Sequence, residues 1–171
     1  MKQTLLLIAV FFLGLQLSDA QKYAYVDTEY ILKNIPEYEA AQKQLDELSE
    51  GYQKEIEALR EQIEKMYNEY QSEKALLIEN QRREREDAII AKEKETKELQ
   101  MKYFGREGEL YKKRQELVKP IQDKVFNAIK DIAEDGHYAL VFDVSGSGLS
   151  ILYTDPKYDK SEDVLQKLGY K

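Results

Sequence analysis

Residues 37–70 read EYEAAQKQLDELSEGYQKEIEALREQIEKMYNEY and give the strongest structural signal in the chain. Glu, Lys, Gln, Ala and Leu dominate this stretch, and all are strong helix formers. Its apolar residues recur at steps of three and four, which is the near-heptad spacing of a coiled-coil seam rather than the wider stripe of a core helix. The predicted seam consists of Leu45, Leu48, Tyr52, Ile56, Leu59, Ile63, Met66 and Tyr70.

The helix-forming composition continues to about residue 135, with only one proline and three glycines after residue 36. A single helix over this length would extend about 150 Å and would separate the two ends of the chain. We therefore predict an antiparallel helical hairpin, an arm over residues 37–117, that bends within residues 77–86. A second and leakier seam is predicted at Ile90, Lys97, Met101, Phe104, Gly108, Tyr111, Gln115, Val118, Val125, Ile129 and Ile132.

The segment before the arm has a different period. Residues 23–27, YAYVD, alternate and are rich in β-formers, which predicts a short strand. Thr28 is predicted to cap a short helix that stops before Pro36, because the residue preceding a proline is pushed out of the helical region.

The segment after the arm predicts a β-hairpin and a final helix. ALVFDV, residues 139–144, reads as one strand, SGSG at 145–148 as the turn, and LSILY at 149–153 as the partner strand. A capping box of Asp159 and Glu162 predicts a helix over 160–168, which Gly169 closes.

The predicted class is therefore α+β, with a small body formed by residues 21–36 and 118–171. A body of about 70 residues is close to the limit of independent folding, and composition offers it no disulfide. Self-association through sheet edges is the remaining route to stability, and a closed barrel of strands would remove those edges. The candidate interface residues are Tyr25, Val26, Leu140, Val141, Phe142, Ile151 and Leu152.

Residues 1–20 are predicted to be a cleavable secretory signal. Lys2 precedes an apolar run from Leu5 to Leu15, which is too short to span a bilayer, and small residues at Ser18 and Ala20 fit a signal peptidase site. We expect cleavage after Ala20 and export to a bacterial periplasm. The alternative is an uncleaved membrane anchor.

Composition excludes several function classes. The chain has no cysteine and one histidine, so it offers no thiol nucleophile, thiolate zinc site or multi-histidine metal site. Its 26 basic and 33 acidic residues give a net charge of -7, which argues against nucleic-acid binding. The SGSG segment lacks the spacing of a nucleophile elbow, and His137 reads as a helix-capping residue. We therefore expect no enzyme activity, no cofactor and no metal.

Three stretches carry a family resemblance: KYAYVDTEYILKNIPEY at 22–38, LVKPIQDKVFNAIKDIAEDGHYALVFDVSGSGLSILY at 117–153, and SEDVLQKLGY at 161–170. They resemble the Skp/OmpH family of periplasmic chaperones in pattern and in order. The resemblance implies a homotrimer whose strands form a central barrel and whose helical arms surround a cavity. It also implies an ATP-independent holdase that binds unfolded outer-membrane proteins there.

The resemblance directs attention to the apolar residues of the arms. A narrow hairpin has little core, so these residues are candidates for client contact, although Tyr67, Tyr70 and Phe104 could instead pack inside the arm. The full set is Tyr67, Tyr70, Leu76, Leu77, Ile89, Ile90, Tyr103 and Phe104.

The resemblance also implies a basic surface that contacts lipopolysaccharide, and here the sequence departs from the family. Acidic residues, Glu84, Glu86 and Asp87, interrupt and follow the arginines at 82, 83 and 85. We therefore do not carry lipid-surface binding or the steering of acidic clients over to this chain.

Gly105, Gly108 and Pro120 interrupt the second half of the arm and are the hinge candidates. A static kink is the alternative to a swinging arm. A structural coiled-coil spacer of the cell envelope, which tethers partners and holds no client, is the alternative to a chaperone.

Overall fold

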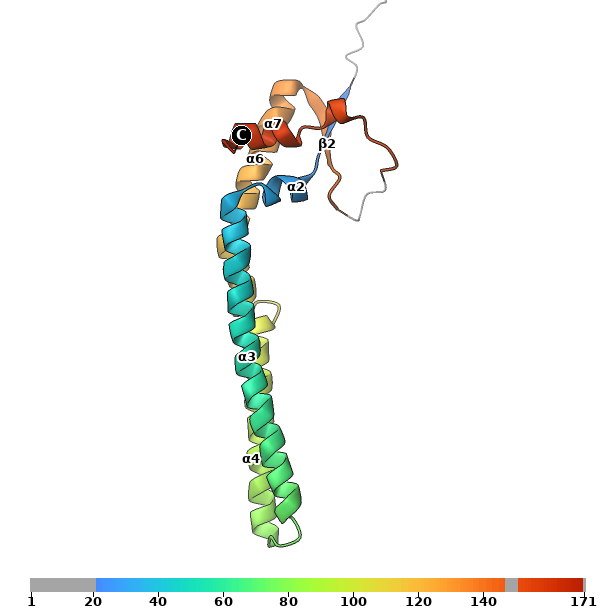
Figure 1. The fold of residues 1–171 in the computed structure, drawn as a ribbon. Coiled ribbons are helices and arrows are strands. Elements are labelled where there is room, and N and C mark those ends of the chain that lie inside the picture. Colours follow the sequence, from blue (N-terminus) through green and yellow to red (C-terminus); the bar gives the residue numbers. More distant parts are fainter. Residues whose placement is uncertain (1–20, 147–150, 171) are drawn as a thin grey trace, which may run out of the picture.

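The protein is described by a computed structural model that covers residues 21–146 and 151–170. It shows a long helical hairpin that extends from a small body containing a two-stranded sheet (Figure 1). This agrees with the predicted combination of a long arm and a small β-containing body. The elements in chain order are β1 (Lys22–Val26), α2 (Thr28–Lys33), α3 (Pro36–Glu73), α4 (Glu79–Phe104), α5 (Glu109–Leu117), α6 (Lys119–Gly136), β2 (Tyr138–Asp143), η1 (Pro156–Tyr158) and α7 (Ser161–Leu168).

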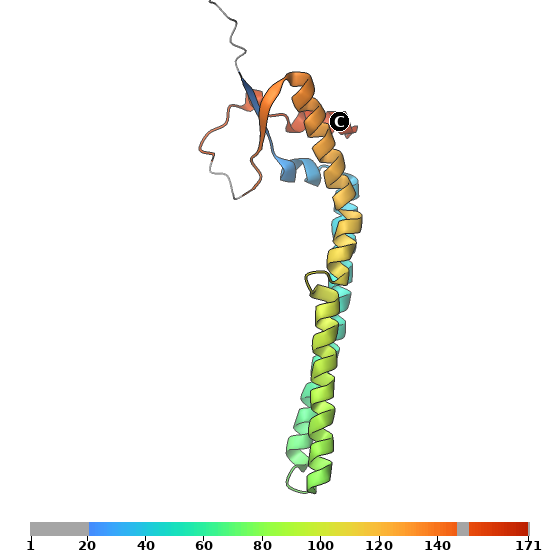
Figure 2. The same cartoon turned by 180° about the vertical axis from the view of Figure 1, so that it is seen from behind.

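The arm consists of α3 on one side and α4 followed by α5 on the other (Figure 2). α3 has 38 residues and no break, and all eight residues of its predicted seam are buried or half-buried, so this prediction is confirmed. The chain reverses at residues 74–78, a few residues earlier than most of the predicted range 77–86. No glycine or proline lies in this turn, which is why the sequence located it poorly.

The predicted seam of α4 is wrong by one residue. Ile90, Lys97, Met101 and Phe104 are exposed, whereas the preceding residues Ile89, Thr96 and Tyr103 are buried against α3. Of the remaining predicted positions, Tyr111 and Gln115 on α5 are also exposed. Adjacent apolar residues at 89–90 and 103–104 leave the choice of face ambiguous, and contact with α3 selects the first of each pair.

The body brings together segments more than a hundred residues apart. β1 lies parallel to β2, with Ala24 beside Val141 and Tyr25 beside Phe142 (Figure 1). The adjacency of the first strand and the later strand agrees with the prediction. The partner strand predicted at 149–153 is not seen, because residues 151–153 are not in a strand and residues 147–150, with part of the turn, lie outside the described residues.

The core of the body lies between the sheet and the helices. Ile31 and Ile35 belong to the same cluster as Val164 and Leu165 of α7, and all four side chains are almost completely inaccessible. Both sides of the arm reach this cluster, since Leu45 of α3 belongs to it and Leu117 of α5 packs against it. The arm is therefore anchored in the same core that holds the sheet.

The helix ends confirm part of the predicted capping. Asp27, not Thr28, caps α2, since its carboxylate accepts a hydrogen bond from the Tyr30 backbone N–H at 2.9 Å. The predicted capping box of Asp159 and Glu162 is wrong, because the N-cap residue of α7 is Lys160, which makes no side-chain cap hydrogen bond. The Asp159 carboxylate instead accepts from the Ser161 N–H, and Gly169 ends the helix as predicted, with a φ of 86°. His137 closes α6 in the left-handed conformation with a φ of 55°, as its assignment to a cap requires.

Within residues 21–146 and 151–170, none of the helices combines the length and apolarity needed to cross a membrane. The predicted signal sequence and its cleavage site after Ala20 lie outside the described residues.

Candidate functional site

The tip of the arm exposes apolar side chains to solvent. Leu76 in the turn is 86% exposed and Ile78 is 65% exposed, while Leu77 between them is half-buried. No element of the described chain covers this tip, because the hairpin is only two helices wide. An apolar tip on an extended arm is available for contact with another molecule.

A second exposed apolar set follows one flank of α4. Ile90, Met101 and Phe104 are exposed and, together with Lys97, recur at steps of seven, four and three, which places them on one face of the helix. This face is distinct from the seam of Ile89, Thr96 and Tyr103. The residues that the seam prediction wrongly assigned to the interior therefore form an external stripe.

A groove of about 400 Å³ lies between α3 and α4 on the arm. Ile63 and Thr96 contribute to its floor, and the exposed Tyr67 stands at its edge. Gln100 and charged residues of both signs line the rest of the groove: Arg60, Glu64, Glu93 and Lys97. The arm thus presents an amphipathic surface rather than a closed pocket.

The eight predicted client residues divide into two groups. Tyr70, Ile89 and Tyr103 are buried inside the arm, so they support the hairpin and do not offer a surface. The other five remain accessible to different extents: Tyr67, Leu76, Leu77, Ile90 and Phe104.

Aromatic residues join the two sides of the arm near its middle. The rings of Tyr52 and Tyr103 stack with their centres 3.9 Å apart, and Phe104 meets Tyr52 edge-on at 6.2 Å. The Tyr103 hydroxyl donates to Glu55 at 2.7 Å and the Tyr52 hydroxyl donates to Glu109 at 3.0 Å. The hydrogen bond to Glu55, aided by burial, raises the pKa of Tyr103 to about 12.

The hinge candidates lie at two different places. Gly105 and Gly108 form the loop between α4 and α5, directly beside the aromatic stack. Gly51 on α3 adjoins Tyr52, so three glycines lie at the same level of the arm. Pro120 lies in the first turn of α6, where its missing N–H costs no helical hydrogen bond.

The body exposes one face of its sheet. Tyr23 and Tyr25 pair with Leu140 and Phe142, and these four residues point away from the core that receives Ala24 and Val26. Leu140 is 54% exposed and Phe142 is 37% exposed. A two-stranded sheet whose apolar and aromatic face is exposed to water is only marginally stable unless further strands or another element cover that face.

A cavity of about 1010 Å³ opens on this face. Its walls are mainly apolar or aromatic, with Lys22, Asp155 and Lys157 as the charged residues. The hydrogen bond between Lys157 and Asp155, at 2.8 Å, raises the pKa of the ammonium and lowers that of the carboxyl. The aromatic and larger apolar residues that line the cavity are Tyr23, Tyr25, Tyr138, Phe142, Ile151, Tyr153 and Tyr158.

The predicted interface residues also divide. Val26 is buried and Val141 packs against the same core, so both stabilise their own chain. Tyr25, Leu140, Phe142 and Ile151 lie on or beside the exposed sheet face, and Leu152 is completely exposed.

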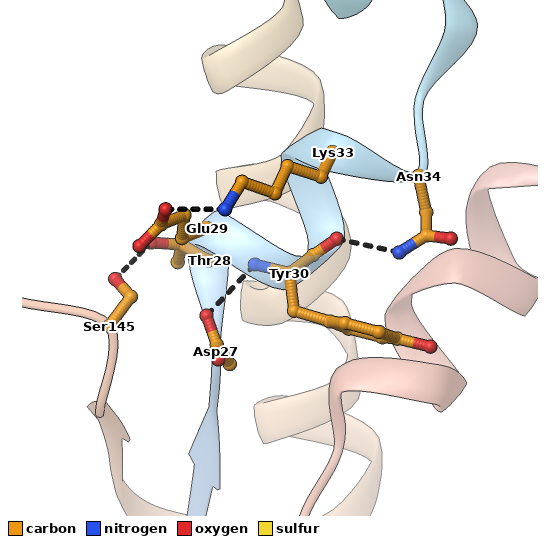
Figure 3. A network of polar contacts seen from close by, with 7 residues as sticks. All are labelled: Asp27, Thr28, Glu29, Tyr30, Lys33, Asn34 and Ser145. Carbon is orange, nitrogen blue, oxygen red and sulfur yellow. Dashed lines mark hydrogen bonds and ion pairs between the residues drawn. The ribbon is translucent and has the colours of Figure 1, made fainter.

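A polar network fixes the end of β2 against the start of α2. Figure 3 shows the Asp27 cap and the contact between the hydroxyls of Thr28 and Ser145, 2.9 Å apart. The Asp143 carboxylate accepts from the Thr28 hydroxyl at 2.6 Å and from the Ser145 N–H at 3.0 Å. Burial opposes ionisation of Asp143, but these hydrogen bonds outweigh it and lower the pKa of this carboxyl.

Sequence reasoning missed the aromatic stack and most of the tyrosines of the cavity. The available signal was the count of 13 tyrosines in a chain without tryptophan. In the described part of the chain, no cluster of histidine, aspartate and glutamate is arranged to hold a metal ion.

Comparison with known proteins gives three findings. The family model for outer membrane protein (OmpH-like) matches residues 22–168. The chaperone protein Skp of Yersinia enterocolitica is 25% identical over 149 residues, which cover 87% of each chain. The crystal structure of a candidate outer membrane chaperone (OmpH-like) from Caulobacter crescentus superposes with a TM-score of 0.64 at 11% identity, covering 87% of this chain and 84% of that one.

Proposed function

We propose, because this chain belongs to the family described as outer membrane protein (OmpH-like), that it is a chaperone that holds unfolded outer-membrane proteins and prevents their aggregation. The similarity to a chaperone protein Skp supports the chaperone role. The observation that carries the proposal is the apolar surface of the arm at the tip and along the flank of α4, which stays exposed in the described chain even though Phe104 meets Tyr52 edge-on.

Holding requires no catalytic site and no ATP. Unfolded β-barrel proteins expose alternating apolar strands that aggregate when left free. Exposed apolar spots separated by charged residues give many weak contacts, and several such contacts acting together bind firmly while each exchanges quickly. Leu76, Ile78, Ile90, Met101 and Phe104 are the residues proposed to make these contacts.

The proposed active form is a homotrimer built on the body. The aromatic face of the sheet and the adjoining cavity would be covered by the strands of other copies in a closed barrel. Tyr25, Leu140, Phe142, Ile151 and Leu152 form the proposed interface, which would leave the three arms around one cavity.

The proposed site of action is the periplasm, reached through a signal sequence cleaved after Ala20. The arms are proposed to swing at the level of Gly51, Gly105 and Gly108. A loop interrupts one side of the arm there, and a glycine weakens the helix on the other side.

The test is light scattering during dilution of an unfolded outer-membrane protein into buffer that contains the mature protein. We expect scattering to be suppressed at near-equal amounts of chaperone trimer and client. The double variant Leu76→Ser with Ile78→Ser should need about five- to tenfold more protein, because it removes apolar contact area at every tip.

The matched control replaces two exposed polar residues of the same arm, Asn68→Ser with Gln71→Ser, and should behave as the wild type. Unchanged aggregation in the presence of the wild-type protein would contradict holding and would favour the envelope spacer.

A further inference from the structure

Gln21 directly precedes β1 and lies at the rim of the aromatic cavity. Its side-chain oxygen Oε1 accepts a hydrogen bond of 2.7 Å from the Tyr23 hydroxyl. Gln21 lies just outside β1 and two residues before Tyr23, a spacing that places two side chains on one side of an extended chain. Pairing with Leu140 fixes Tyr23 in turn.

We propose that Gln21, once it is the amino-terminal residue, is converted to pyroglutamate, and that Tyr23 is the positioning residue for this reaction. The inference rests on the cleavage after Ala20 proposed above, which exposes the α-amino group of Gln21. Neither the holding of clients nor the assembly of the body is needed for it.

The reaction balances without any co-reactant. The α-amino nitrogen forms a bond to Cδ of its own side chain, the bond between Cδ and Nε2 breaks, and a proton from the amine leaves with Nε2 as ammonia. The product is a five-membered lactam, and no atom is oxidised or reduced. Because nucleophile and electrophile belong to one residue, the encounter costs little entropy.

Tyr23 acts on the electrophile. Negative charge develops on Oε1 as the amine attacks Cδ, and the phenol that donates to Oε1 stabilises this charge.

The modification changes the charge at the cavity. A free α-amino group has a pKa of roughly 8 and is largely protonated at neutral pH. The cavity already contains Lys22 and Lys157, with Asp155 as the acidic residue of its lining. The lactam is neutral, so cyclisation removes a positive charge that would otherwise be desolvated when a partner covers the cavity.

The first test is the intact mass and amino-terminal sequence of the full chain expressed with its own leader and isolated after export. We expect a chain that starts at residue 21, is lighter by one ammonia, and is blocked to stepwise sequencing. A chain that starts at an unmodified Gln21 would overturn this inference and leave the proposed export intact. A different first residue would overturn the proposed cleavage site and this inference together.

The second test measures the role of Tyr23 in a pulse-chase, from the fraction of cyclised chain against time after export. Tyr23→Phe should slow cyclisation about three- to tenfold, less than the roughly hundredfold loss when a closed enzyme site loses an oxyanion donor. Tyr153→Phe is the matched control, since Tyr153 lines the same cavity, is not one of the proposed interface residues, and is not the tyrosine that donates to Gln21. Equal rates for Tyr23→Phe and the wild type would overturn the role of Tyr23.

Discussion

The arm and the body of this chain bury their apolar side chains in different ways. The arm buries only a narrow seam, but α3 and α4 pack against each other and cover that seam between them. The body has the most deeply buried residues of the described chain, but one face of its two-stranded sheet remains open and aromatic. The arm covers its own seam within one chain, whereas the body has a well-packed core but leaves one face of its sheet uncovered.

This difference indicates what each part is for. A helix makes its own backbone hydrogen bonds, so a hairpin can extend into solvent and still carry exposed apolar spots. A two-stranded sheet has free edges and is marginal in water without further strands or a cover. This difference agrees with the proposal that the arm contacts clients reversibly and that the body associates with other copies of the chain.

Replacing one buried isoleucine with alanine in each region should give the largest difference in stability between the body and the arm. Ile31→Ala in the fully buried core of the body should lower the free energy of unfolding by about 3 to 4 kcal/mol, because it leaves a cavity that several elements share. Ile56→Ala in the seam of the arm should cost about 2 kcal/mol, since solvent can reach the gap. Urea denaturation followed by circular dichroism measures both, and an equal loss would contradict the contrast.

Two glycines at the same level of the arm should respond in opposite directions to alanine. A Cβ at Gly108 would lie 2.7 Å from the Tyr103 carbonyl oxygen and 2.9 Å from the Gly105 nitrogen, so Gly108→Ala should destabilise by about 1 to 3 kcal/mol.

Gly51→Ala meets nothing within 4 Å and removes a glycine from inside a helix. It should therefore stabilise the chain by about 0.5 to 1 kcal/mol. Denaturation midpoints of the two variants provide the measurement, and a shift in the same direction would show that the loop at 105–108 is not tightly packed.

The titration of Tyr103 tests whether the middle of the arm is ordered in solution. Its folded pKa of about 12 lies above the ordinary value of 10.0 because the hydrogen bond to Glu55 favours the neutral phenol. The contact should therefore be fully present below pH 10 and disappear as the pH rises through about 12. The pKa values of Tyr52, Tyr70 and Tyr170 are raised as well, so absorbance titration should show several late tyrosines. Glu55→Gln should move the one that ionises near 12 toward 10, whereas Glu61→Gln should leave it in place.

Single ion pairs on the surface of the arm should have the smallest effect. Lys94 and Glu98 are 3.8 Å apart with both side chains largely exposed, so Lys94→Gln should cost less than about 0.5 kcal/mol. The helix content and the melting temperature at moderate salt provide the check. A loss comparable to that of Ile56→Ala would mean that charge rather than the seam holds the arm together.

Features that depend on residues close together in the sequence were predicted better than features that depend on contacts between distant segments. The seam of α3 was correct because its steps of three and four leave one consistent face. On α4 the neighbouring pairs at 89–90 and 103–104 allowed two faces, and only the contact with α3 distinguishes them. The early turn at 74–78 consists of residues that also form helices, so no local signal marks it.

The candidate surfaces were harder to predict than the elements. The parallel pairing of β1 with β2 joins residues more than a hundred positions apart, and a local hairpin was the simpler interpretation of the pattern. The stack of Tyr52 on Tyr103 depends on the register of the two arm helices, which the sequence does not fix. Exposure of Leu76 followed more directly, because a narrow tip has little interior, but Leu77 beside it is half-buried.

The measurement that tests the central claim most directly is sedimentation equilibrium of the mature protein beside two lysine variants. We predict a mass of three chains for the wild type and for Tyr111→Lys on the arm, and dissociation for Phe142→Lys on the open sheet face. A wild-type protein that sediments as one well-folded chain, or a Phe142→Lys variant that keeps the mass of three, would contradict the claim that the body is completed by its own copies.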